Sequence, residues 1–130
     1  MLFEGIEKLQ KKYDIEIPNE YNNFILRTEM HDYYGKKIKL NNQEYEIGHF
    51  LKMGDSSSED LFDWYLLRVP EYKDYLTIAF CIYEEEIAIK VRGENKGKVV
   101  LLIGKDETEE ISYDIIDLAD NFTEFKNMIL

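Results

Sequence analysis

Three apolar runs between residues 75 and 103 dominate the pattern of hydrophobic and polar positions along the chain. They read YLTIAFCIY, IAIKVRG and GKVVLLI, and only the short polar breaks EEE and ENK separate them. Apolar residues recur at every second position, as they do in a strand that turns one face toward a core. Because the breaks are so short, the pattern predicts an antiparallel meander.

Both faces of this meander carry apolar residues. The residues expected to face the core are Leu76, Ile78, Phe80, Ile82, Ile87, Ile89, Val91, Val99, Leu101 and Ile103. The opposite face is half-apolar, so we expect it to be partly covered too; its apolar members are Ala79, Cys81, Ala88, Val100 and Leu102.

Two short helices are predicted ahead of the sheet. Helical spacing relates Leu2, Ile6, Leu9 and Tyr13, and the charged residues turned outward are Glu4, Glu7, Lys8, Lys11 and Lys12. Pro18 suits the first turn of a second helix, where its missing N–H costs nothing. This helix should run to about Thr28 and bury Tyr21, Phe24, Ile25 and Thr28. Such a helical hairpin is too small to hide its own apolar face, so the sheet must cover it.

Further elements lie on both sides of the meander. A second hairpin is predicted over residues 36–51 around Asn41-Asn42-Gln43. Ile38 and Leu40 alternate along its first arm, and Tyr45, Ile47 and His49 along its second. A helix is expected from Leu61 to Val69, because Leu61, Trp64, Tyr65 and Arg68 lie on one stripe, and Pro70 ends it. A charged loop is expected over residues 106–110.

The chain should close with a helix that begins at the capping box Asn121-Phe122-Thr123-Glu124. Its anchors are Leu118, Phe122, Phe125 and Ile129. Together these elements predict one α+β domain over residues 1–130. Its sheet is mostly antiparallel, with about five or six strands, and is flanked by an N-terminal helical hairpin and a C-terminal helix.

Length and cysteine content fit a soluble cytoplasmic domain. No Pro/Gly/Ser-rich linker divides the 130 residues. The single cysteine, Cys81, cannot form an intramolecular disulfide, which suits a reducing compartment. The N-terminus lacks the pattern of a signal peptide, and no apolar run approaches the roughly 18 to 20 residues that span a bilayer.

The formal charge of −11 is unevenly distributed. Residues 1–52 hold eight Lys/Arg and nine Asp/Glu, whereas residues 53–130 hold eight and eighteen. Such a field repels phosphate backbones, which disfavours direct nucleic-acid binding, and attracts a basic protein partner. The alternative interpretation is that the acidic surface only keeps the domain soluble and monomeric.

The residues that usually carry catalysis are sparse. His31 and His49 have no second His or Cys at ligand spacing, so no metal site is predicted. Cys81 lacks a basic neighbour in sequence, and the glycines at 93, 97 and 104 indicate turns rather than a phosphate loop. Glu84, Glu85 and Glu86 fall in a strand-to-strand turn, where we expect solvated carboxylates instead of a tuned acid/base pair. No catalytic, cofactor or metal site is therefore predicted.

Tyrosines offer a different role. Exposed tyrosine is common in protein contacts, although a tyrosine can also lid the core with its hydroxyl in water. The tyrosines beside acidic or loop segments are Tyr33, Tyr34, Tyr65, Tyr72, Tyr75 and Tyr83.

Three segments together resemble the SUKH superfamily of Smi/Knr-type regulators and their bacterial relatives. They are Ile6 to Tyr13 with Ile17-Pro18-Asn19-Glu20-Tyr21 to Leu26, then Leu76-Thr77-Ile78-Ala79 with Ile87-Ala88-Ile89, and finally Leu118 to Phe125. The chain departs from the family where Thr28-Glu29-Met30 replaces an Asn-Gly pair and where Glu84-Glu85-Glu86 replaces Gly-Asp. No family binding residues are carried over at those positions.

The resemblance implies a non-enzymatic binding protein without cofactors. Bacterial members are regarded as immunity proteins that neutralise polymorphic toxins, often nucleases. We therefore expect a basic toxin domain as partner, no direct nucleic acid or membrane partner, and a monomer or weak homodimer. The expected contact residues are Asp55, Glu59, Asp60, Tyr83, Glu84, Glu85, Glu86, Asp106, Glu107, Glu109 and Glu110. The alternative, which the eukaryotic members suggest, is a regulatory or scaffolding module in intracellular signalling.

Overall fold

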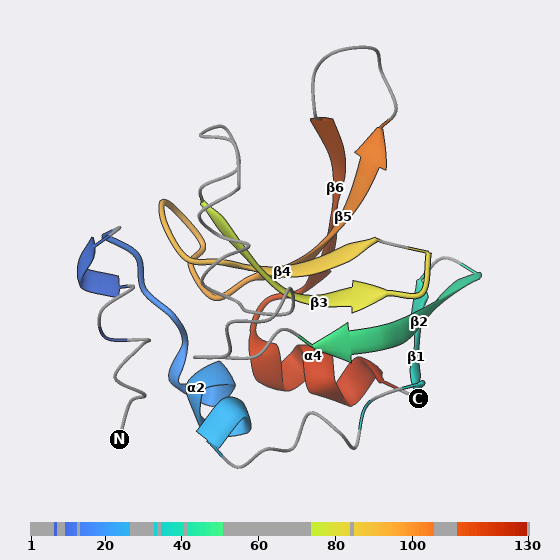
Figure 1. Cartoon of the computed structure of the whole chain (residues 1–130), viewed down its shortest axis with the longest axis horizontal. Coiled ribbons are helices and arrows are strands. Elements are labelled where there is room, and N and C mark those ends of the chain that lie inside the picture. The colour runs from blue at the N-terminus through green and yellow to red at the C-terminus, as the bar shows by residue number, and fades with distance from the viewer. Residues whose placement is uncertain are drawn as a thin grey trace.

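Six strands form one antiparallel meander in the computed structural model, which describes residues 7, 10–12, 14–26, 33, 35–40, 42–50, 74–83, 85–105 and 112–129. Each strand pairs with the next one along the chain, in the order β1-β2-β3-β4-β5-β6. The strands are β1 (Lys37–Leu40), β2 (Gln43–Phe50), β3 (Tyr75–Cys81), β4 (Glu86–Lys90), β5 (Val99–Lys105) and β6 (Ser112–Ala119). The helices whose bounds the structure describes are α2 (Asn19–Leu26) and α4 (Phe122–Met128), so the predicted α+β class is confirmed (Figure 1).

The predicted hairpin of residues 36–51 is present as β1 and β2. Leu40 pairs with Gln43, and Asn42 adopts a φ of 68° in the connection between the strands. Asparagine tolerates this left-handed conformation better than most residues do, which explains its place in the turn. Ile38, Tyr45 and Ile47 are buried as expected.

A β-bulge in β3 changes which residues face the core. The register shifts between Thr77 and Ala79, and an extra residue in a strand reverses the alternation beyond it. Ala79 and Cys81 therefore join Leu76 and Ile78 in the core cluster. The prediction that Ile82 faces the core was wrong, because that side chain is 47% exposed.

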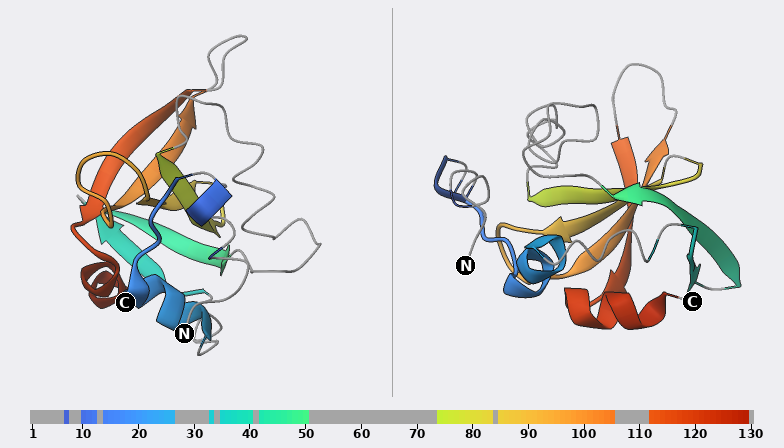
Figure 2. Two further views of the ribbon diagram at one scale, coloured as in Figure 1. Left: turned by 90° about the vertical axis from the view of Figure 1, so that its left-hand side faces the viewer. Right: turned by 60° about the horizontal axis from the view of Figure 1, so that its bottom comes forward.

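Helices α2 and α4 pack side by side against one face of the sheet (Figures 1 and 2). Their contact is aromatic: the ring of Phe122 lies 5.3 Å from that of Tyr21 and 5.1 Å from that of Phe24, both edge-on. Such pairs contribute about 0.5–1.5 kcal/mol each beyond the burial of their area. The predicted buried positions Tyr21, Phe24 and Phe125 are confirmed.

The capping box of α4 is confirmed with one difference. The backbone N–H of Glu124 donates to Oδ1 of Asn121 at 2.8 Å. The Glu124 carboxylate accepts from the backbone N–H of Asp120 at 3.3 Å, one residue before the cap itself. Beyond the helix, Ile129 forms an isolated bridge with Ile38 of β1. The C-terminal end therefore covers part of the first edge of the sheet.

The second face of the sheet is also buried, as expected. Ala88, Val100 and Leu102 form a small cluster with at most 1% of their surface exposed, and Tyr75 and Tyr113 pack against it. Val91 and Val99, in contrast, lie in the main core under the helices. The central strands are thus covered on both faces.

Some predictions lie outside the described residues. These are Leu2, Ile6, Leu9 and Tyr13 of the first helix, the side chain of Ile25, Thr28, the side chain of His49, and the helix over residues 61–69. Within the part of the chain that the structure describes, no helix is long and apolar enough to cross a bilayer.

Candidate partner-binding site

The turn between β3 and β4 presents two large hydrophobic side chains to solvent. Ile82 is 47% exposed and Tyr83 is 81% exposed. The backbone N–H of Cys81 donates to the carbonyl of Glu85 at 2.8 Å, and that of Ile82 donates to the carbonyl of Glu46 at 3.0 Å. These bonds fasten the turn to its own hairpin and to β2. Ile82 and Tyr83 are therefore exposed on a turn that backbone hydrogen bonds fix to the sheet.

Close packing between β2 and β3 supports this turn. A Cβ atom on Gly48 would lie 3.2 Å from the carbonyl oxygen of Phe80. That distance is tighter than ordinary van der Waals contact, so glycine permits the backbones to approach here. The register between the two strands also shifts between Ile47 and His49. A larger side chain at position 48 would push β2 away from the base of the turn.

The structure separates the glutamates that the sequence placed together. Glu86 is the first residue of β4, and its side chain is buried. Oε1 of Glu86 accepts a hydrogen bond from Oγ1 of Thr77 at 2.6 Å. The expectation of a solvated carboxylate was thus wrong for Glu86, because it lies opposite Phe80 in the ladder, beyond the turn. A buried Glu86 side chain is not part of the exposed surface of the turn.

Glu85 is only partly exposed. Its Oε1 atom is buried and has no hydrogen-bond partner. The remaining expected contact residues lie outside the described residues: Asp55, Glu59, Asp60, Glu84, Asp106, Glu107, Glu109 and Glu110. Of the expected set, Tyr83 is the residue that the structure places fully at the surface.

The tyrosines divide between the two roles considered for them. Tyr33 packs against the core, with its ring 5.5 Å from that of Phe24. Tyr75 is half-buried, and burial together with the nearby Asp74 raises the pKa of its hydroxyl. Tyr83, in contrast, touches solvent over most of its surface. The lid interpretation therefore fits Tyr33 and Tyr75, whereas Tyr83 is available for contact.

Cys81 points into the core just before the exposed turn. Burial, reinforced by the negative charge of Glu85, raises the pKa of its thiol to about 12. The thiol stays protonated at neutral pH, and a protonated thiol is a poor nucleophile. His49 lies in β2 opposite Phe80, while His31 lies outside the described residues. Cys81 therefore behaves as the small core hydrophobe that the sequence predicted.

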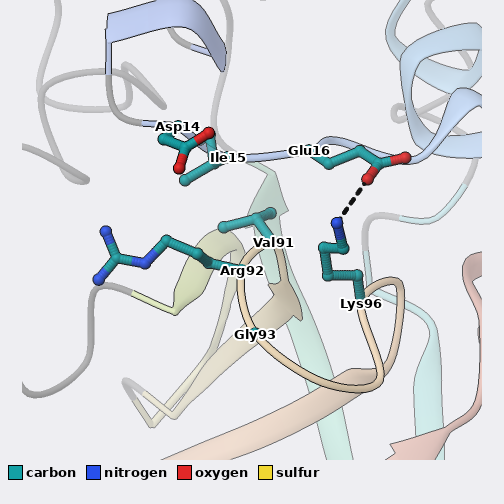
Figure 3. Close-up of a pocket in the computed structure, with 7 residues that line it drawn as sticks. All are labelled: Asp14, Ile15, Glu16, Val91, Arg92, Gly93 and Lys96. Atoms are coloured by element: carbon teal, nitrogen blue, oxygen red, sulfur yellow. Dashed lines mark hydrogen bonds and ion pairs between the residues drawn. The ribbon is translucent and has the colours of Figure 1, made fainter.

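A polar cleft of about 400 Å³, which was not predicted, lies at the other end of β4 (Figure 3). It is lined by Asp14, Ile15, Glu16, Val91, Arg92, Gly93 and Lys96. The backbone N–H of Glu16 donates to the carbonyl of Val91 at 2.8 Å, which brings the two distant segments together. Figure 3 shows Lys96 reaching toward Glu16, while Arg92 extends to the opposite side.

The cleft is held by exposed ion pairs. Nζ of Lys96 lies 2.8 Å from Oε2 of Glu16, and this hydrogen bond raises the pKa of Lys96. Nε of Arg92 lies 3.1 Å from Oδ1 of Asp74. Exposed pairs of this kind contribute little to stability. A smaller cavity of about 180 Å³ adjoins the pair and extends to Asn121 at the start of α4.

The turn that forms one wall of this cleft depends on residues with positive φ. Gly93, Asn95 and Gly97 adopt φ values of 83°, 60° and 97°. The prediction that Gly93 and Gly97 are turn residues is confirmed, and for Gly104 it was wrong because Gly104 lies within β5. In the described part of the chain, no group of three His, Cys, Asp or Glu residues could hold a metal ion.

Comparison with known proteins identifies the family. The model of the SMI1/KNR4 family (SUKH-1) matches residues 3–128, nearly the whole chain, so the chain belongs to that family. No curated protein and no solved structure matches it. Members of this family are generally non-catalytic immunity or regulatory proteins, which fits a protein-binding role.

Proposed function

We propose, from membership of the SMI1/KNR4 family, that this chain is an immunity protein that binds a basic, nuclease-type toxin and covers its active-site surface. The protein inhibits the toxin only by occupying that surface. A nuclease needs a basic surface to accept phosphates, and an acidic inhibitor can take that place by presenting similar charge. The chain performs no reaction of its own in this proposal.

The observation that carries the proposal is an exposed hydrophobic turn on a strongly acidic member of this family. The chain has a formal charge of −11, and Ile82 and Tyr83 project from the β3–β4 turn. Exposed aromatic residues frequently anchor protein interfaces, and complementary charge speeds the encounter with a partner. In this proposal Tyr83 supplies the anchor, and the acidic surplus of residues 53–130 supplies the attraction.

The acidic segments also support a basic partner over a nucleic acid. Eighteen of the 27 Asp and Glu residues lie in residues 53–130, against eight Lys and Arg. A nucleic acid would meet repulsion over this half of the chain, whereas a phosphate-binding protein would meet attraction. The proposed contact comprises Asp55, Glu59, Asp60, Tyr83, Glu84, Glu85, Asp106, Glu107, Glu109 and Glu110.

Capture from the native cell tests this function. The chain is immobilised, exposed to lysate at low salt and washed with increasing salt. The proposal expects one basic protein that salt releases, and it expects the chain to suppress the nuclease activity of that protein at equimolar ratio. Co-expression of the chain should also restore the growth of cells that make the captured protein.

The matched control is needed because any acidic bait retains some basic proteins. A bait in which Asp106, Glu107, Glu109 and Glu110 are replaced by their amides should retain less of the captured protein. Several weak partners without toxicity, and no rescue of growth, would contradict the immunity function and favour the regulatory module. Absence of any partner in a cell that encodes a toxin beside this chain would also contradict it.

A further inference from the structure

Strand β6 is an edge strand of the sheet that the described residues form. It is the last strand in the sheet order, and none of the described elements pairs with its outer side. Figure 2 shows β6 along the margin of the sheet, with α4 below it. The opposite edge differs, because β1 is bridged to Ile129 at the C-terminal end. The described part of the chain thus leaves one of its two edges available for pairing.

Exposure along β6 agrees with an open edge. Every residue of β4 except Lys90 is buried. None of the residues 113–119 of β6 is buried, and Asp114, Ile115 and Asp117 are exposed. Ile115 keeps 42% of its surface in solvent and is one of three large hydrophobic side chains exposed in the described part of the chain. An apolar side chain in the middle of an exposed edge strand favours contact with another chain.

The pairing pattern shows which backbone groups point outward. The backbone N–H of Lys90 donates to the carbonyl of Lys98, so this pair belongs to the hydrogen-bonded set between β4 and β5. Hydrogen-bonded pairs alternate along an antiparallel ladder, and neighbouring residues of one strand bond to opposite sides. Leu101 and Ile103 must therefore bond toward β6, where they pair with Ile116 and Asp114.

The residues between them consequently bond in the other direction. Ile115 lies between Asp114 and Ile116, and Asp117 follows Ile116. Their N–H and C=O groups point away from β5, toward the open side. Because both groups are strong hydrogen-bonding partners, an extended chain placed there would gain a regular ladder.

The charge on this edge selects the occupant. Strand β6 and the residue after it carry three exposed acidic residues, Asp114, Asp117 and Asp120, and no Lys or Arg. Nζ of Lys98, in the segment before β5, lies 2.8 Å from Oδ2 of Asp117. A second copy of this chain would bring two acidic strands together, and like charges opposite each other destabilise a strand pair. A basic segment meets complementary charge instead.

We propose that β6 takes an extended, lysine- or arginine-bearing segment of the protein partner as a seventh strand. The segment pairs with the outward backbone groups of Ile115 and Asp117, and one of its apolar side chains covers Ile115. Its cations lie beside the acidic residues of the edge. This inference rests on the proposed function for the basic character of the partner, and it adds the mode of binding.

Amide hydrogen exchange followed by NMR tests the pairing residue by residue. The probe is a capped peptide of alternating lysine and valine with the length of β6, eight residues. At saturating peptide, exchange of the Ile115 and Asp117 amides should slow by about tenfold or more, because they acquire hydrogen-bond acceptors. The amides of Asp114 and Ile116 already bond to β5, so their exchange should hardly change. They serve as the internal control.

Two further samples separate strand pairing from simple charge attraction. A peptide with glutamate in place of lysine should leave all four amides unchanged. The substitution Ile115→Pro removes an outward N–H, and proline is tolerated where an edge strand faces solvent. It should abolish the added protection at Asp117. Protection by the lysine peptide that is absent from β6, or that persists in Ile115→Pro, would overturn the inference.

The capture experiment and the exchange experiment fail independently. A captured and neutralised nuclease without peptide protection at β6 would keep the proposed function and remove the pairing mode. Protection at β6 without any neutralised toxin would keep the pairing mode and remove the proposed function.

Discussion

Tyr21 and Tyr83 are the same amino acid in opposite settings. Tyr21 of α2 is fully buried against Phe122, whereas Tyr83 in the β3–β4 turn is 81% exposed. The first ring joins the helices to the sheet, and the second contributes nothing to the core. The difference shows that the same residue type can stabilise the core or remain at the surface, where it is available for contact with a partner. Stability and binding should therefore respond to different substitutions.

The largest loss of stability is expected for Phe122→Ala. The ring is fully buried and contacts Tyr21, Phe24 and Phe125. Truncating a buried phenylalanine leaves a cavity and costs about 3–5 kcal/mol. Chemical denaturation followed by circular dichroism measures the change. A loss below about 1 kcal/mol would mean that the aromatic cluster does not hold α4 on the sheet.

Cys81 is buried, whereas the next residue, Ile82, is exposed. The thiol has a pKa of about 12 in the folded chain, against 9.0 for an unperturbed thiol. Its thiolate fraction at pH 8 is therefore about a thousandfold lower, and alkylation should slow by a similar factor relative to the unfolded chain. Because the folded chain keeps this thiol protonated, the free energy of unfolding should fall as pH rises from 9 toward 12. Alkylation at equal rates in both states would contradict burial of the thiol.

Thr77→Val tests the buried carboxylate on the second face. The substitution preserves shape but removes the hydroxyl that donates to Glu86 at 2.6 Å. Loss of a donor to a buried carboxylate should cost about 1–3 kcal/mol in the free energy of unfolding at neutral pH. Thr77→Ser keeps the donor and is the matched control. Equal losses in the two variants would show that packing, and not the hydrogen bond, accounts for the effect.

Tyr21→Phe should have a smaller effect of the opposite sign. The hydroxyl of Tyr21 is buried without a hydrogen-bond partner, and burial raises its pKa. Removing an unsatisfied buried group is expected to stabilise the fold by up to about 1 kcal/mol. Thermal denaturation gives the sign. A clear loss of stability would mean that the hydroxyl has a partner, such as an ordered water.

Tyr83→Ala should change stability least. Its side chain makes no core contact, so the free energy of unfolding should move by less than about 0.5 kcal/mol. Affinity for the captured partner should fall by about tenfold or more if Tyr83 anchors the interface. Titration calorimetry measures the binding loss. Unchanged affinity would remove the β3–β4 turn from the contact.

The sequence predicted those parts of the fold that follow from periodicity. Alternating apolar residues located β1 to β5, and the cap at Asn121 located the start of α4. The bulge between Thr77 and Ala79 has no signal in a single sequence, so the predicted facing of Ile82 was wrong. Strand β6 was not located from the sequence for a different reason. Its Asp114 and Asp117 interrupt the apolar pattern, because an edge strand needs less apolar surface.

The candidate site was less accessible to sequence reasoning. Nothing in the run Glu84-Glu85-Glu86 distinguishes one carboxylate from another, yet the strand pairing places Glu86 inside the sheet. The cleft at residues 14–16 forms because Glu16 bonds to Val91, a contact across 75 positions of the chain. No local sequence pattern predicts a contact between residues so far apart in the chain. The exposed Tyr83, by contrast, follows from its place in a short turn.

The rate of association with the captured partner tests the central claim most directly. In one variant the carboxylates of Asp106, Glu107, Glu109 and Glu110 are replaced by amides, and in a charge-matched control the same is done at Asp14, Glu20, Glu44 and Glu94. The account predicts that the first variant associates about tenfold or more slowly at low salt, with a weaker dependence on salt, because electrostatic steering is lost. The control should retain most of the wild-type rate. Equal rates for wild type and the first variant at low salt would contradict the account.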